Sequence, residues 1–284
     1  MKRRFRYGGQ AVIEGVMMRG PEAIATCVRA RNGQIAVHRE AVSIRPAHGL
    51  AAVSVLRGIR AVWQAFFGGV KSLAVSAELS GEEAALSESE IRLTAALAAL
   101  MGAGLFFLAP AAAAQWLPEG LGSIEKNLLE GLLRLGLFLG YLWAVSRRRE
   151  IGRVFAYHGA EHKAIFCVEK GLPLTVEHVR AQSRFHPRCG TNFLMVVMLF
   201  SLFAFLPLGW PDLWLRLASR LALLPLIAGL AYEWVMWAAD SSLGTVRFLN
   251  WPGLMLEWLT TKEPQDDQIE VAIAALQEAS RSGA

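Results

Sequence analysis

Four long apolar segments dominate the pattern of hydrophobic and polar positions along the chain. They comprise residues 93–117, 128–146, 189–211 and 218–239. The first and third carry no charged side chain, and each is long enough to cross about 30 Å of hydrocarbon as a helix. The second holds Glu130 and Arg134, an i,i+4 pair that can neutralise itself at the interface, and the fourth contains one acid, Glu233. The pattern predicts four transmembrane helices.

The N-terminal third has shorter patterns. Residues 23–42 contain two β-leaning runs around Asn32-Gly33, a dipeptide that is a strong hairpin signal. Residues 50–79 are apolar on one side and basic on the other, which is typical of a helix that lies in a membrane interface. We therefore expect a small β-hairpin unit followed by an interfacial helix.

Two more helices are predicted after the last apolar segment. Residues 250–264 offer Asn250 as an N-cap and Pro252 in the first turn, so an interfacial helix should begin there. Residues 265–280 form a capped, soluble helical pattern. The fold class is therefore a mainly α integral membrane protein, with about four transmembrane helices, interfacial amphipathic helices and a small N-terminal β-hairpin unit.

This pattern divides the chain into six parts. They are an N-terminal glycine-rich segment and hairpin (1–49), an interfacial helix and linker (50–90), transmembrane helices 1 and 2 (91–146), a loop (147–188), transmembrane helices 3 and 4 (189–240) and a C-terminal helical region (241–284).

Composition and charge strengthen the membrane interpretation. Apolar residues make up 54% of the 284, and the mean hydropathy is +0.35. The loop 147–188 has nine Lys or Arg against four acids, so the positive-inside rule places this loop and both termini in the cytoplasm. The net charge of +5 then reflects topology and contact with anionic lipid. We expect the lipid bilayer as a partner and no nucleic acid, with a homo-oligomer as the alternative to a monomer. No disulfide bonds are expected among the three cysteines, which lie on the predicted cytoplasmic side.

The stretch "YHGAEHKAIFC", residues 157–167, carries the candidate chemistry. Residues 150–170 have helical periodicity, which places His158 and His162 on one face with Glu161 beside them. Two neutral imidazoles on one helical face can bind Zn²⁺ or a similar divalent metal, and the neighbouring carboxylate can act as a general base. The H-x-x-E-H order is that of inverzincins. The alternative is an ordinary set of polar residues on the wet face of a helix.

A hydrolytic zinc site needs a third protein ligand, for which the sequence offers two choices. Glu233 is a lone acid inside a predicted transmembrane helix, a costly position that favours function; otherwise it would pair with a transmembrane arginine. His186 and Cys189 form the second candidate pair. The alternative is that they belong to an ordinary connecting loop, which Pro187 also indicates. For Glu233 to reach the histidines, the chain must bend near the arginine cluster 147–149 and Gly152.

The N-terminal stretch "YGGQAVIEGVMMRGP" supplies candidate substrate contacts. Glu14 and Arg19 are its polar residues most able to hold a substrate. A glycine-rich turn leading into the hairpin is the favoured structural alternative. The stretch has no nucleotide-binding motif.

Four blocks together resemble one known family. They are "YGGQAVIEGVMMRGP", "YHGAEHKAIFCVE", "HPRCGTNFL" and "LTTKEPQDDQIEVAIAAL". The chain resembles the YqhQ-like family of bacterial polytopic membrane proteins, also called domain of unknown function 1385. The resemblance implies a multi-pass protein of the bacterial cell membrane with a metal site, and a metal-dependent enzyme of unassigned reaction.

These observations favour a metal-dependent hydrolase at the cytoplasmic membrane face, with Glu161 as general base and a peptide or lipid-linked bond as substrate. The alternative is a non-enzymatic metal-binding scaffold or adaptor, whose hairpin and tail helix bind a cytoplasmic partner.

Overall fold

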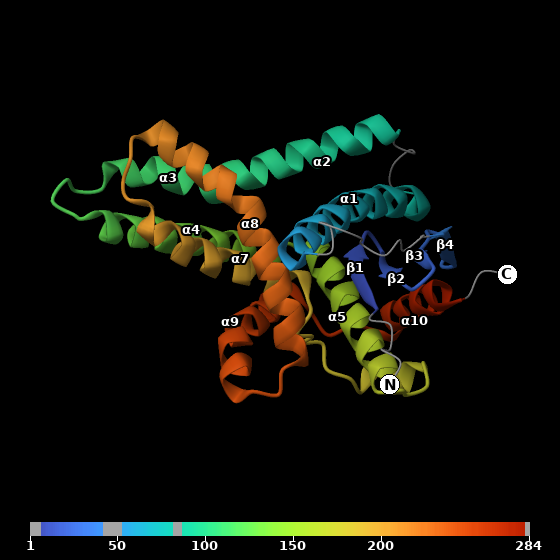
Figure 1. The fold of residues 1–284 in the computed structure, drawn as a ribbon. Helices are drawn as coiled ribbons and strands as arrows, with labels where there is room; N and C mark the ends of the chain where they lie inside the picture. Colours follow the sequence, from blue (N-terminus) through green and yellow to red (C-terminus); the bar gives the residue numbers. More distant parts are fainter. Residues whose placement is uncertain (1–6, 42–52, 82–86, 282–284) are drawn as a thin grey trace.

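Apolar helices extend to one side of the molecule, and a small β-sheet with its covering helices lies at the other (Figure 1). This computed structural model describes residues 7–41, 53–81 and 87–281. The ends of the chain and parts of the predicted N-terminal segment and linker, at residues 42–52 and 82–86, lie outside the described residues.

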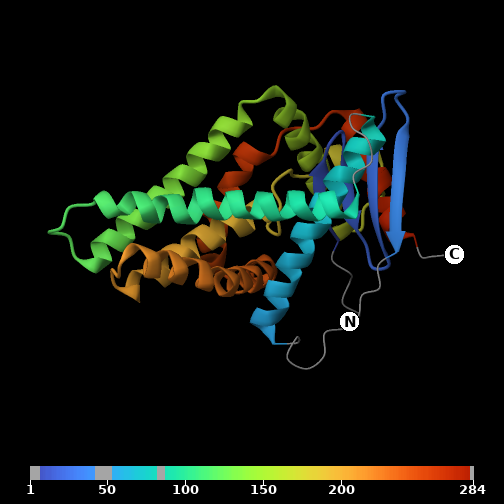
Figure 2. The ribbon, with the colours of Figure 1, turned by 90° about the horizontal axis from the view of Figure 1, so that it is seen from above.

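Four helices in the described part of the chain are long and apolar enough to cross a membrane, as predicted. The first comprises α2 (Glu88–Ala103), a π-helical turn η2 (Gly104–Leu108), α3 (Ala109–Ala113) and a 3₁₀ turn η3 (Ala114–Trp116). The others are α4 (Ser123–Ser146), α7 (Gly190–Phe205) with the 3₁₀ turn η4 (Leu206–Leu208), and α8 (Leu213–Asp240). Figure 2 shows the same helices extending away from the sheet in a second view. The chain is therefore a mainly α membrane protein.

The predicted pair of Glu130 and Arg134 forms, and both side chains are buried among the helices. Arg134 Nη2 donates to Glu130 Oε1 at 2.5 Å, and each side chain is 1% exposed. Arg220 of α8 also donates to Glu130. Arg134 Nε donates to the carbonyl of Phe106, which Pro110 cannot bond because proline has no N–H. Arg134 thus donates to a carbonyl in the irregular part of the first helix.

The sheet has four antiparallel strands in the order β1-β2-β3-β4. They comprise β1 (Gly8–Val12), β2 (Gly15–Arg19), β3 (Ala23–Arg29) and β4 (Ile35–Ala41). The predicted hairpin is confirmed as β3 and β4, with Gly33 at a φ of 80°. The glycine-rich stretch was expected to form a turn that leads into the hairpin. It instead forms β1 and β2, which are joined at Glu14, whose φ is 48°. The described part of the N-terminal unit is therefore a four-stranded sheet and not a hairpin alone.

Three helices pack against this sheet. They are α1 (Ser54–Ser80), α5 (Arg149–Glu169) and α10 (Asp266–Ser280). Met18 and Cys27 of the sheet share a core with Tyr157 of α5 and Leu276 of α10. The short helix α6 (Val176–Arg180) packs on α5 and α10. α1 also packs along α8, which connects the sheet to the bundle.

Two helix boundaries position the site. α4 ends at Ser146 and α5 begins at Arg149, so the chain breaks at the arginine cluster where the bend was expected. The predicted start at Asn250 is wrong, because α9 runs from Gly244 to Thr260 with Pro252 inside it. Asn250 is instead buried and accepts a hydrogen bond from Asn192 of α7. α10 confirms the predicted tail helix and has a capping box of Gln265 and Gln268.

Candidate metal centre

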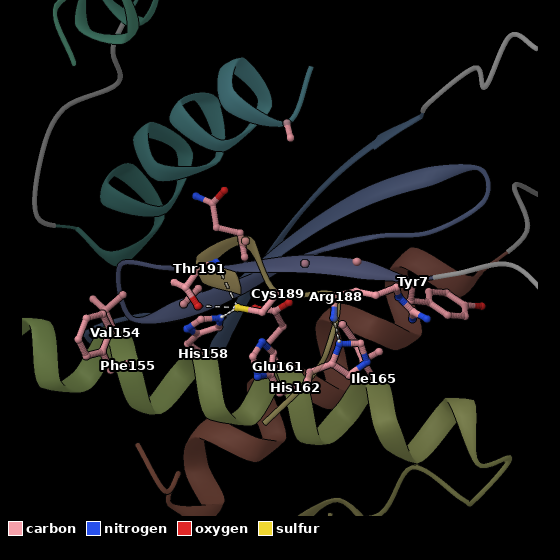
Figure 3. Close-up of a pocket in the computed structure, with 17 residues that line it drawn as sticks. Tyr7, Val154, Phe155, His158, Glu161, His162, Ile165, Arg188, Cys189 and Thr191 are labelled. Carbon is pink, nitrogen blue, oxygen red and sulfur yellow. Dashed lines mark hydrogen bonds between the residues drawn. The ribbon is translucent and has the colours of Figure 1, made fainter. Parts of the chain in front are cut away.

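Helix α5 presents His158, Glu161 and His162 toward one cavity (Figure 3). The two imidazoles are one helical turn apart, with ring centroids 4.4 Å from each other. The chain at Lys262 passes directly against α5 at Gly159, which lies between the two histidines. A Cβ at Gly159 would lie 2.1 Å from the carbonyl oxygen of Lys262. The absence of a side chain at this position allows the C-terminal segment to reach His158.

Cys189 comes to the same place from the N-cap of α7. Its Sγ atom lies 3.2 Å from His158 Nε2, and the Thr191 N–H donates to the sulfur. His158, His162 and Cys189 can each offer one ligand atom, and these atoms lie within 4.8 Å of one another. Residues 31 positions apart along the chain therefore form a compact group of potential metal ligands.

Backbone carbonyls orient both imidazoles. His158 Nδ1 lies 2.8 Å from the Thr260 carbonyl oxygen, and His162 Nδ1 lies 2.6 Å from that of Arg184. A ring nitrogen facing a carbonyl must donate, so the neutral tautomer of each ring carries its proton on Nδ1. Each Nε2 is then the atom with a lone pair for a metal. This arrangement is typical of metal-ligating histidines.

Glu161 is the carboxylate of the cavity. Its side chain is buried, and among the described residues its Oε2 atom has no hydrogen-bond partner. Burial raises the pKa of Glu161, although His158 and His162 oppose the shift. Because a raised pKa suits proton transfer near neutral pH, Glu161 has the properties of a general base or acid.

Cys189 and His158 shift each other's pKa, so that each favours the charged form of the other. Burial disfavours the Cys189 thiolate, but the two histidines outweigh it and hold the pKa of Cys189 well below its usual range. Burial likewise disfavours the His158 imidazolium, yet the sulfur raises the pKa of His158 to about 10. The thiolate is the form of cysteine that binds metals.

Glu257 of α9 is a member of this environment that the sequence did not indicate. It is fully buried, its Oε2 accepts the His186 N–H at 2.7 Å, and the same oxygen lies 3.6 Å from His162 Nδ1. Burial raises the pKa of Glu257 to about 9. A single acid among the apolar residues of "GLMLEWL" was the available signal.

The two other proposed third ligands have different partners. Glu233 accepts hydrogen bonds from Arg57 of α1 at 3.1 and 2.5 Å and does not line the cavity. It is neither with the histidines nor paired to Arg134. His186 lines the cavity, but its Nε2 contacts Glu169 and its Nδ1 accepts the Arg188 N–H. The structure thus brings Cys189, and not these two, into the ligand group.

The proposed substrate residues lie outside the cavity. Glu14 forms an ion pair with Arg153, with one hydrogen bond of 2.6 Å, and its other oxygen lies 3.5 Å from the Tyr157 hydroxyl. Arg19 pairs with Gly8 at the far end of β2. Neither lines the cavity, which has a volume of about 390 Å³. Its N-terminal wall instead consists of residues 7–11.

The donor set fits a catalytic zinc site. Two imidazole nitrogens and one thiolate sulfur are ligands that Zn²⁺ prefers, and three protein ligands leave the fourth tetrahedral position open. Glu161 lies beside the three and faces the same cavity.

Comparisons with known proteins agree on one family. Residues 53–282 match the family described as "Protein of unknown function (DUF1385)". The chain is 36% identical over 295 aligned residues to the "Uncharacterized protein YqhQ" of Bacillus subtilis (strain 168), covering 97% of this chain and 92% of that protein. No solved structure gives a significant match. The chain belongs to the DUF1385 family.

Proposed function

We propose that this protein is a membrane-bound, metal-dependent hydrolase acting at the cytoplasmic membrane face. His158, His162 and Cys189 would hold the cation, for which Zn²⁺ fits best, and Glu161 would be the general base. One observation carries the proposal: the three ligand atoms lie within 4.8 Å of one another, beside a buried carboxylate oxygen that has no hydrogen-bond partner in the described part of the chain. The basic excess of residues 147–188 supports the cytoplasmic location.

The residues divide the chemistry among them. A bound divalent cation would supply Lewis acidity and lower the pKa of a coordinated water. Glu161 would accept the proton from the attacking water and return it to the leaving group. The carbonyls of Thr260 and Arg184 would hold both imidazoles in the ligating orientation.

Metal content tests the ligand assignment. Purified full-length protein should contain about one zinc per chain by elemental analysis, as a single three-ligand site requires. A His158→Ala/His162→Ala double variant and a Cys189→Ala variant should each lose that metal. His178→Ala, which alters a histidine of α6 that does not line the cavity, is the matched control and should keep it. A folded wild-type protein that binds no divalent metal would refute the assignment.

Glu161→Gln tests the hydrolase. This variant should keep the metal, because Glu161 is not a ligand, but lose turnover. Membrane peptide and lipid profiles of deletion cells expressing either form would reveal the substrate as a species that only the wild type depletes.

The scaffold or adaptor alternative predicts the opposite result. If Glu161→Gln retains metal and fully complements a deletion phenotype, the carboxylate has no chemical role. The protein would then be a metal-binding membrane scaffold.

A further inference from the structure

Strand β1 lies at the edge of the sheet, and the hydrogen bonds of its neighbours define which of its groups face outward. The Arg29 N–H donates to the Glu14 carbonyl at 2.8 Å, so the even-numbered residues of β2 bond to β3 and the odd-numbered residues bond to β1. The register pairs those odd residues with Gly8, Gln10 and Val12. The N–H and C=O groups of Gly9 and Ala11 therefore point away from the sheet.

These outward groups have no hydrogen-bond partner among the residues that the structure describes. Within residues 7–41, 53–81 and 87–281, no hydrogen bond satisfies the outward N–H and C=O groups of Gly9 and Ala11. The next outward amide, that of Ile13, donates to Ser76 Oγ of α1 at 3.1 Å. The helix thus covers one end of the edge and leaves the segment from Gly9 to Ala11 open along the cavity.

The open edge runs beside the candidate metal centre. Figure 3 shows the strand that follows Tyr7 passing over the side chains of Glu161 and Cys189. A Cβ at Gly9 would lie 2.9 Å from Glu161 Oε1, so the missing side chain allows the carboxylate to approach the strand. Anything bonded along this edge would lie against the centre.

We infer that β1 binds an extended polypeptide segment as an additional strand, through the backbone groups of Gly9 and Ala11. A polypeptide backbone presents N–H and C=O groups at the repeat of a strand edge, whereas a lipid-linked molecule has no such repeat. The inference rests on the proposed function for one point only, that the bound segment is the substrate of the hydrolase. It assigns a peptide bond, positioned by β1, as the bond that faces Glu161.

Binding of an unfolded chain tests this inference on the full-length protein in detergent. The probe is fluorescein-labelled, reduced and carboxymethylated lactalbumin, followed by fluorescence anisotropy. Ala11→Pro removes one outward N–H without breaking a bond to β2 and should raise Kd about tenfold, as expected for one lost hydrogen bond. Val37→Pro is the matched control, because Val37 is exposed and its amide faces outward from β4, the other edge strand. This control should bind as the wild type does.

Competition on the wild-type protein gives a second result that needs no variant. A capped hexapeptide of alternating lysine and valine should displace the probe, and the same peptide N-methylated at every residue should not. Equal competition by both peptides, or equal weakening by the two proline variants, would overturn the inference. Probe binding should persist in the metal-free His158→Ala/His162→Ala variant. The experiments can therefore refute the strand-addition inference and the proposed hydrolase function independently of each other.

Discussion

Gly159 connects the local sequence to the geometry of the candidate centre. It lies where the segment after α9 crosses α5, and the Lys262 N–H donates to the Phe155 carbonyl at 2.8 Å. This crossing holds the Thr260 carbonyl against His158 Nδ1. The orientation of one proposed ligand thus depends on a glycine that is not itself a proposed ligand.

We expect Gly159→Ala to weaken metal binding about 10- to 100-fold, the usual effect of disturbing an outer partner of a metal ligand. The added Cβ would meet the rigid Lys262 carbonyl at 2.1 Å and push Thr260 away from His158. Gly152→Ala in the same helix is the control, because its Cβ would meet the flexible end of the Lys262 side chain. Zinc titration of both variants measures the difference, and equal affinities would contradict the role of the crossing.

Glu257 stabilises the loop that carries His186. We expect Glu257→Ala to lower the free energy of unfolding by about 1–3 kcal/mol, because it leaves the buried His186 N–H without an acceptor. Glu257→Gln retains an acceptor oxygen at the same position and should be milder. Thermal unfolding of the purified variants ranks them. Equal losses would mean that the acceptor oxygen for the His186 N–H is not the cause of the destabilisation.

At the scale of elements, two helices meet through glycines. A Cβ at Gly58 of α1 would lie 2.5 Å from the carbonyl oxygen of Gly229, and one at Gly229 would lie 2.7 Å from that of Val55. This close approach brings Arg57 to Glu233. α1 is thereby fixed to α8 by backbone contact as well as by an ion pair.

Gly58→Ala should therefore destabilise the protein by about 1–3 kcal/mol, the usual effect of overpacking, because the backbone it meets cannot move as a side chain can. Gly136→Ala in α4 is the control. It has open space around its Cβ and should be neutral or stabilising by up to about 1 kcal/mol. Thermal unfolding in the same detergent compares them. If Gly58→Ala matches the control, the helices do not depend on this contact.

Local sequence patterns predicted their elements well. The differences between prediction and structure come from contacts between residues that are far apart in the sequence. The apolar segments, the Asn32-Gly33 hairpin and the His pair on one helical face follow from local periodicity. β1 and β2 were not predicted as strands because their glycines favour turns, and pairing with β3 overrides that preference. Glu233 looked like a ligand because its partner Arg57 lies 176 positions earlier. No local pattern shows which residues meet across such a separation.

At the scale of the whole molecule, the candidate centre lies where the sheet unit joins the apolar bundle. Cys189 caps the first turn of the candidate span Gly190–Leu208, and His158 belongs to a helix that packs on the sheet. The centre is therefore close to one end of a membrane helix. Which side of the membrane that end faces decides which substrates can reach it.

The basic residues of 147–188 predict that this end faces the cytoplasm. Single cysteines at Ser123, the first residue of α4, and at Thr175, before α6, can test it in a chain with Cys27, Cys167 and Cys189 replaced by alanine. Because α4 separates the two positions, they should lie on opposite sides of the membrane. We expect an impermeant thiol reagent added to intact cells to label Ser123→Cys only, and to label Thr175→Cys once the membrane is opened. The reverse pattern in intact cells would place His158 and His162 outside, and a hydrolase working from the cytoplasm would then be impossible.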